Sequence, residues 1–284
     1  MTIRRRRRKS IKRIVSTVSA RSRIRIHTVE SLSDFIAFLS DNFDDKDTLL
    51  FRGQREDWPL EPKIARLKLR SREDTVLRTE RKMREDFELQ ALAFAIDWEP
   101  ESDWEWLSLA QHYGMATRLL DWTANSLAAL WFAVRKPPIH EGRKDDGWRT
   151  AVVWVLEPQE NDYVNLSDPK KKKETPFNGT RTRVYRPKHI TRRIAAQSGW
   201  FTVHKYVSNR KRPFVPLEKQ KNFKNSLTKI LVPAELFPDL RYDLDRCGVN
   251  TASMLPDLSG LSKYMEWYHS LLDDEKAGQP RLHG

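Results

Sequence analysis

The sequence predicts an α+β fold: a single mixed domain in which a central small β-sheet is flanked by helices, preceded by a disordered basic N-terminal tail. Three observations support this fold class. Short strand-like segments of mixed placement lie between unevenly spaced helical segments, and no internal repeat is visible. The basic residues concentrate at the N-terminus, so residues 1–25 are expected to be the tail and residues 26–284 the domain.

The chain has the size and apolar content of a folded domain. Its 284 residues are 39% hydrophobic and include 10 Trp and 12 Phe, enough to fill a sizeable core. The longest apolar run, residues 127–134, is much shorter than the ~20 residues that cross a bilayer, so no membrane contact is predicted. Cys247 is the single cysteine, which rules out an internal disulfide and agrees with a reducing compartment.

The net charge of +13 lies mostly in the tail. Residues 1–25 hold eleven Lys and Arg and no acid, which leaves 41 of the 52 basic residues against 39 acids in the remainder. The tail lacks the apolar stretch of a secretory signal, so a cytoplasmic location is expected, although transit peptides share its Arg and Ser richness. A disordered end is the first interpretation, and salt-sensitive contact with nucleic acid is the second. The residues assigned to that contact are Arg4, Arg5, Arg6, Arg7 and Arg8.

Helices are predicted from apolar spacing, helix-forming composition and capping residues. Ser31 or Ser33 can cap the first helix, and Gly114 is suited to end the third in a left-handed conformation. The predicted helices cover residues 31–43, 73–97, 103–113, 124–136, 234–246 and 258–272.

Strands are predicted from β-branched and alternating segments. Residues 48–51 form a short strand that ends at Arg52-Gly53, where the glycine lets a turn tighten or a ligand approach the backbone. Residues 151–156 are a continuous apolar run typical of a buried central strand. Residues 200–207 and 227–232 complete the strands, and the polar residues 157–180 are expected to form a long surface loop or flap.

Several common enzyme motifs are missing. No two of the ten glycines have the G-x-G spacing of a dinucleotide-binding turn. Gly142 and Gly147 have P-loop spacing, but Trp148 and Arg149 stand where Lys and Ser or Thr are needed. The seven histidines are scattered without a second His four residues after His140, so no metal site is predicted. The G-x-S-x-G elbow of serine hydrolases is also missing.

Polar residues within apolar surroundings form three islands at residues 51–54 (FRGQ), 111–122 (QHYGMATRLLDW) and 196–201 (AQSGWF). With these islands the sequence resembles the FRG-domain family, which is named for a Phe/Tyr-Arg-Gly motif. The resemblance also covers residues 58–60 (WPL), 129–133 (ALWFA) and 254–258 (MLPDL), where relatives often read Leu-Phe-Pro-Asp-Leu. It spans roughly residues 45–265. The family name does not supply a reaction.

A weaker resemblance is to arginine-type ADP-ribosyltransferases, in the order of an Arg-Gly strand, a Thr-containing strand before an Ala-rich helix, and a third polar strand motif. This resemblance implies NAD as a substrate, with Arg52 holding a diphosphate or ribose. Arginine suits that role because it pairs bidentately with phosphate oxygens. The third motif departs from the family, since Gln197-Ser198-Gly199 has no carboxylate and Glu218 is the nearest downstream acid. That departure leaves a binding site without catalysis as an open alternative.

Each candidate also has a purely structural interpretation. Arg52 and Asp121 can form a buried salt bridge, and Asp121 or Thr123 can cap the helix that follows. Gln111 lies toward the apolar face of its helix, where it either braces the backbone or faces a ligand. His112 lies on the polar arc, which favours an exposed or hydrogen-bonded histidine over a general base.

The single-site hypothesis is that the three islands converge on one concave site. Arg52, Asp121 and Gln197 are the candidate catalytic residues. The candidate ligand-binding residues are Gly53, Gln111, His112, Thr117, Arg118 and Trp122. Two functions follow: an enzyme that uses NAD or a related nucleotide in ADP-ribosyl transfer or NAD hydrolysis, in stress or phage defence, and a non-catalytic recognition module for nucleotide, nucleic acid or protein, assisted by the tail.

Overall fold

The computed structural model describes residues 24–46, 48–70, 75–91, 93–94, 100–139, 149–165, 174–187, 198–208 and 211–276. Three features of the sequence analysis lie outside these residues. They are the Arg4 to Arg8 run of the tail, the Lys170 to Lys173 run of the predicted flap, and the candidate catalytic residue Gln197.

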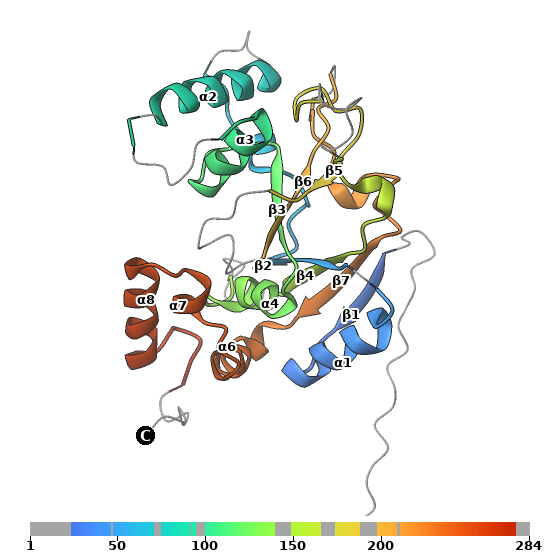
Figure 1. The fold of residues 1–284 in the computed structure, drawn as a ribbon. Helices are drawn as coiled ribbons and strands as arrows, with labels where there is room; N and C mark the ends of the chain where they lie inside the picture. The colour runs from blue at the N-terminus through green and yellow to red at the C-terminus, as the bar shows by residue number, and fades with distance from the viewer. Residues whose placement is uncertain are drawn as a thin grey trace, which may run out of the picture.

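A mixed seven-stranded sheet forms the centre of the molecule (Figure 1), in the order β1-β7-β4-β2-β3-β6-β5. Strand β1 pairs with β7 in parallel, and the other neighbouring strands pair antiparallel. The strands are β1 (Arg25–Thr28), β2 (Leu50–Gln54), β3 (Leu119–Thr123), β4 (Ala151–Leu156), β5 (Arg183–Tyr185), β6 (Gly199–Val203) and β7 (Leu227–Val232). The α+β fold class is confirmed.

Helices cover one face of this sheet on the β7, β4 and β2 side (Figure 1). Their apolar residues, such as Phe35, Ala129 and Leu240, form the largest core cluster with Phe51 and Val153 of the sheet. The described helices are α1 (Leu32–Phe43), α2 (Val76–Ala91), α3 (Asp103–His112), α4 (Ser126–Val134), α6 (Phe237–Arg246), α7 (Thr251–Met254) and α8 (Leu258–His269). Of these, α2 and α3 lie at the β3 end of the sheet and not on this side (Figure 1). Within the described segments, no helix has the length and apolarity to cross a membrane.

The opposite face of the same strands is covered by extended segments and short turns. Leu60, Leu217 and Phe223 are fully buried against Leu50 and Trp154 there. At the β3 and β6 end of the sheet, α3 supplies the apolar side chains of a separate cluster with β3, β5 and β6. The face under the extended segments is covered continuously, since Trp122 of β3 belongs to the same cluster as Leu50 and Trp154. The helical face instead carries two separate clusters, one on the β7, β4 and β2 side and one at the β3 and β6 end.

The β2–β3 pairing at the centre of the sheet is unusually short. Phe51 and Thr123 are its one paired position, whereas β2 pairs with β4 at five positions and β3 pairs with β6 at five. The two strands diverge beyond this pair, and backbone that diverges within a sheet opens space between the strands. The candidate site lies in that space.

Element boundaries differ from the prediction in ways that affect the site. Arg52 and Gly53 lie inside β2, not in a turn after it, because they pair with Trp154 and Val153 of β4. Helix α4 starts at Ser126, and its N-cap is Asn125, whose side chain accepts hydrogen bonds from the first helical turn. The predictions of Asp121 or Thr123 as this cap were therefore wrong.

Candidate functional site

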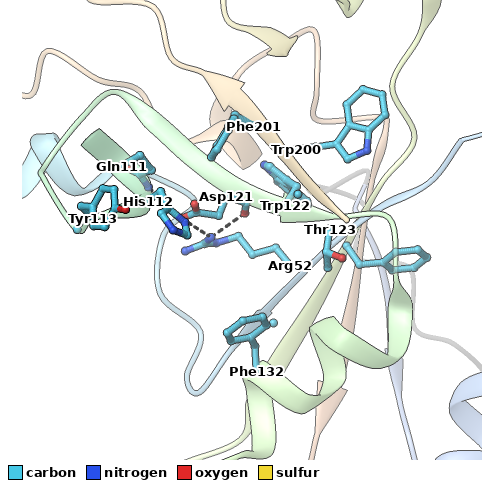
Figure 2. A pocket seen from close by; sticks show the side chains of 14 residues that line it. Arg52, Gln111, His112, Tyr113, Asp121, Trp122, Thr123, Phe132, Trp200 and Phe201 are labelled. Atoms are coloured by element: carbon cyan, nitrogen blue, oxygen red, sulfur yellow. Dashed lines mark hydrogen bonds and ion pairs between the residues drawn. The ribbon is translucent and has the colours of Figure 1, made fainter. Parts of the chain in front are cut away.

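A cavity of about 600 Å³ lies where β2 and β3 diverge (Figure 2). Its walls come from β2, the end of α3, β3, α4 and the start of β6. The residues that line it are Phe51, Arg52, Gly53, Gln111, His112, Tyr113, Gly114, Asp121, Trp122, Thr123, Phe132, Gly199, Trp200 and Phe201. Small-molecule sites have volumes of roughly 300 to 1,000 Å³, so the cavity is large enough for a nucleotide-sized ligand.

Arg52 crosses the gap between the two strands toward Asp121 (Figure 2). Its Nη1 donates a 2.7 Å hydrogen bond to the main-chain oxygen of Asp121 and lies 3.8 Å from that residue's carboxylate Oδ2. The Arg52 Nε is buried and has no hydrogen-bond partner among the described atoms. A buried guanidinium N–H without an acceptor is costly unless a ligand supplies one.

The charge of Arg52 is held in an environment that opposes it. Burial lowers the pKa of the Arg52 guanidinium, the nearby Asp121 carboxylate raises it, and the positive charge of Arg66 lowers it. Arginine stays protonated at neutral pH, so the balance leaves a partly desolvated cation with one exposed carboxylate beside it. An anionic group in the cavity would stabilise this cation.

Asp121 is held by a chain of hydrogen bonds that begins inside the domain. Thr117 Oγ1 donates to Gln111 Oε1 at 2.8 Å, and Gln111 Nε2 donates to Asp121 Oδ2 at 3.0 Å. Because the amide of Gln111 is fixed at its oxygen by Thr117, its N–H group must point toward Asp121. The carboxylate is thereby oriented, although 59% of the Asp121 side chain is exposed.

Aromatic rings line much of the remaining wall. Phe132 projects from α4 below Arg52, and His112 and Tyr113 lie at the end of α3 (Figure 2). The rings of His112 and Tyr113 meet edge to face with centroids 5.1 Å apart. Tyr113 is 69% exposed, so its ring is accessible for stacking against a ligand, whereas the Trp200 ring already contacts Tyr163 and the guanidinium of Arg186.

Gly53 is needed for packing. A Cβ built on Gly53 would lie 1.8 Å from the main-chain oxygen of Ala129 in α4. Close approach of β2 and α4 therefore requires glycine here, and this contact sets the position of Phe132 on the cavity wall. The predicted turn was wrong, because Gly53 lies within β2 and its close neighbour is the main chain of α4. The approach of a ligand to this glycine stays a prediction.

Arg118, grouped with the ligand-binding residues from the sequence, does not line the cavity. It is 1% exposed, and its Nη2 and Nε donate to Glu80 Oε2 at 2.6 and 2.9 Å. Its Nη1 donates to the main-chain oxygen of Pro176, and its guanidinium lies over the ring of Phe177. Arg118 thus belongs to the interior of the domain. Thr117 is likewise buried and reaches the site only through Gln111.

The structure therefore brings together Arg52, Gly53, Gln111, His112, Asp121 and Trp122 from the predicted set. The sequence did not identify Phe132 as a cavity residue, because an aromatic residue in an Ala-rich helix is expected to belong to the core. It also did not assign Tyr113, Trp200 or Phe201, although these residues lie in the islands. Ser198, just before β6, has a φ of 47°, a conformation that is uncommon outside glycine and places strain at the cavity rim. No described group of three or more His, Cys, Asp or Glu residues could hold a metal ion.

The family model of the FRG domain matches residues 47–141. All the cavity-lining residues lie in this segment except Gly199, Trp200 and Phe201. No curated protein and no solved structure matches the chain.

Proposed function

We propose, from the premise that this chain carries an FRG domain, that the cavity of this domain binds an NAD-like nucleotide and cleaves its nicotinamide–ribose bond. One observation carries the proposal. A single cavity joins a partly desolvated arginine, an oriented carboxylate and accessible aromatic rings. These groups complement the three parts of a dinucleotide: anionic phosphates, a ribose that becomes electron-poor, and planar bases.

Arg52 is the proposed phosphate contact. One of its N–H groups is held by Asp121, and its buried Nε lacks an acceptor. A diphosphate oxygen that contacts the accessible part of this side chain, which is 23% exposed, would pair with the guanidinium and neutralise its charge. The positive charge of Arg66, which already lowers the pKa of Arg52, would add to the attraction for phosphate.

Asp121 is the proposed carboxylate of the reaction. As the bond between ribose C1′ and the pyridinium nitrogen breaks, its electron pair goes to that nitrogen and nicotinamide leaves as a neutral molecule. The ribose becomes oxocarbenium-like, and a carboxylate next to it stabilises the positive charge. Water or an acceptor group then attacks C1′ and loses a proton. Gln111 keeps the Asp121 carboxylate oriented throughout.

The test combines binding and turnover in the full chain. Calorimetric titration with NAD, ADP-ribose and ATP measures binding, and chromatography of released nicotinamide measures cleavage. Arg52→Ala is expected to weaken NAD binding by at least about tenfold. Asp121→Asn is expected to retain binding and to lower nicotinamide release by about 10² or more. Asp41→Asn, an exposed change on α1, is the matched control and leaves both unchanged.

Two results would contradict parts of this proposal. Saturable binding of NAD or ADP-ribose without nicotinamide release would make the domain a recognition module for nucleotides and remove the catalytic role of Asp121. Lack of binding by all three nucleotides to the folded chain would remove the nucleotide assignment altogether.

A further inference from the structure

A second, smaller hollow lies at the other end of strand β6. Its volume is about 310 Å³, and the segment before β5 and the segment after β6 form its sides. The main cavity contains Phe201 of β6, whereas this hollow contains Lys205. Four residues of extended strand span about 13 Å, so the two sites are separate.

The charged side chains that line this hollow are all basic. They are Arg181, Lys205, Lys219 and Lys221. Among the described residues, Arg181 Nη2 lies 3.5 Å from Asp162 Oδ1. The three lysines are exposed, and no described carboxylate forms an ion pair with them. The hydroxyl of Thr180 and the amide of Asn222, both exposed, add neutral polar groups to the same wall. Lysine, threonine and asparagine side chains together are typical contacts for a phosphate group.

The basic character extends beyond the hollow. Residues 205–224 contain seven Lys and Arg and one acid, Glu218. The Glu218 carboxylate is turned inward, where it accepts a hydrogen bond from the main-chain N–H of Leu60 at 3.1 Å. Burial raises the pKa of this carboxyl, and the positive charge of Lys219 lowers it. Lys211 and Arg212 are exposed on the same segment.

The apolar residues of the segment discriminate between possible anionic partners. Phe214, Leu217 and Phe223 are fully buried in the core. A membrane-binding surface combines basic residues with apolar side chains that insert into the lipid, and this segment keeps its large apolar groups inside. A run of cations around a concave, hydroxyl- and amide-lined hollow instead fits a chain of phosphates.

We propose that this surface, formed by Arg181, Lys205, Lys211, Arg212, Lys219 and Lys221, binds the phosphate backbone of a nucleic acid. A backbone phosphate occupies the hollow, and adjacent phosphates contact Lys211 and Arg212 along the segment. Because the contacts are to phosphates, binding is independent of base sequence and falls steeply with salt. The surface is distinct from the β2–β3 cavity and does not depend on the reaction proposed there.

The experiment measures fluorescence anisotropy of a labelled 20-nucleotide single-stranded RNA, and of the matching single-stranded DNA, with the full chain at several salt concentrations. The test variant is Lys205→Ala/Lys219→Ala/Lys221→Ala. The control variant, Lys68→Ala/Lys82→Ala/Lys276→Ala, removes the same charge from exposed sites elsewhere. Both variants retain the N-terminal tail, so a contribution from the tail is common to all samples.

The test variant is expected to bind at least about tenfold more weakly near 0.1 M salt, and its slope of log affinity against log salt is expected to fall by about 2. The control variant is expected to keep the wild-type slope to within about half a unit. Equal affinities of the two variants would overturn the proposal. Binding to vesicles that contain anionic lipid, without binding to RNA or DNA, would overturn it in favour of a membrane surface.

Discussion

Arg52 and Arg118 stand in two neighbouring regions of the molecule, and both meet a carboxylate, but their environments are opposite. Arg118 is 1% exposed and its partner Glu80 is 0% exposed, with contacts of 2.6 and 2.9 Å between them. Arg52 is 23% exposed, Asp121 is 59% exposed, and guanidinium and carboxylate are 3.8 Å apart. The first pair is closed to ligands, and the second borders a cavity.

The difference shows what separates a structural arginine from a candidate ligand contact. Arg118 donates to Glu80 and to Pro176, and Glu80 also accepts the main-chain N–H of Arg118, so this pair is satisfied by the chain itself. Arg52 retains a buried N–H without an acceptor. An arginine whose donors are satisfied in the interior stabilises the fold, whereas a guanidinium that is 23% exposed beside a cavity is available to a ligand.

Removing a partner from the closed pair should have the largest effect. Glu80→Ala leaves the buried charge of Arg118 uncompensated, which is expected to lower the free energy of unfolding by about 3 to 5 kcal/mol. Urea denaturation followed by fluorescence measures this loss. Glu85→Ala, an exposed change on the same helix, is the control and should alter stability by less than about 0.5 kcal/mol. A loss below about 1 kcal/mol in Glu80→Ala would remove the distinction between the two pairs.

We expect acid to lower the stability of the fold through His204, a buried histidine whose pKa is affected by the charges of both Arg52 and Arg118. Burial, together with the charges of Arg52 and Arg118, lowers the pKa of His204 to about 3, although a hydrogen bond with the main chain of Val215 opposes the shift. The unfolded chain therefore binds this proton near pH 6.5 and the folded chain does not, so stability falls as the pH decreases from 6.5 toward 3. Between pH 7 and 4 the loss from this group is on the order of 3 kcal/mol.

The measurement for this pH dependence is the free energy of unfolding against pH for the wild-type chain and for His204→Gln. The difference between the two curves isolates His204 from the carboxyl groups that also titrate in this range. Parallel curves between pH 7 and 4 would show that His204 does not titrate as its burial requires.

Gly53→Ala should change the packing of β2 against α4 beside the cavity. The added methyl group meets the main-chain oxygen of Ala129, so β2 and α4 must separate. Overpacking of this kind costs about 1 to 3 kcal/mol, and the accompanying shift of Phe132 should weaken ligand binding in the cavity. Denaturation and NAD titration measure the two effects. Gly179→Ala is the control, since its new Cβ would be 3.5 Å from the nearest atom and make ordinary contact.

Arg52→Ala should have the smallest effect on stability. Its carboxylate contact is long and Asp121 is largely exposed, so the loss is expected to be less than about 1 kcal/mol. Urea denaturation of Arg52→Ala beside the exposed change Arg70→Ala checks this value. A loss as large as that of Glu80→Ala would instead assign Arg52 to the structural framework, as the salt-bridge interpretation of the sequence holds.

Local signals predicted most of the fold. Strands β4 and β7 occur at the predicted residues, and Gly114 ends α3 with a φ of 88° in the left-handed region. Strands β1 and β5 were missed because β1 has four mostly exposed residues and β5 only three. Such short strands form through pairing with neighbours that are distant in sequence, which periodicity does not detect.

The site was predictable only where its partners are close in sequence. Gln111, Thr117 and Asp121 occur within one island, so their proximity could be anticipated, although the hydrogen-bond order could not. The assignment of Arg118 depended on Glu80, 38 residues earlier in a helix whose sequence shows only a charged surface pattern. Tertiary contacts, and not the local sequence, decide that Arg118 is buried with a partner and that Arg52 faces the cavity.

The contact between Gly53 and Ala129 has a genetic consequence. A side chain at position 53 would collide with a main-chain oxygen, and position 129 already carries alanine. Trimming the facing side chain therefore cannot restore the fit. Suppressors of a Gly53 substitution should be absent at position 129 and should arise only where they shift the whole of α4. Position 53 is thus expected to change only together with a substitution that shifts α4, and not together with one at position 129.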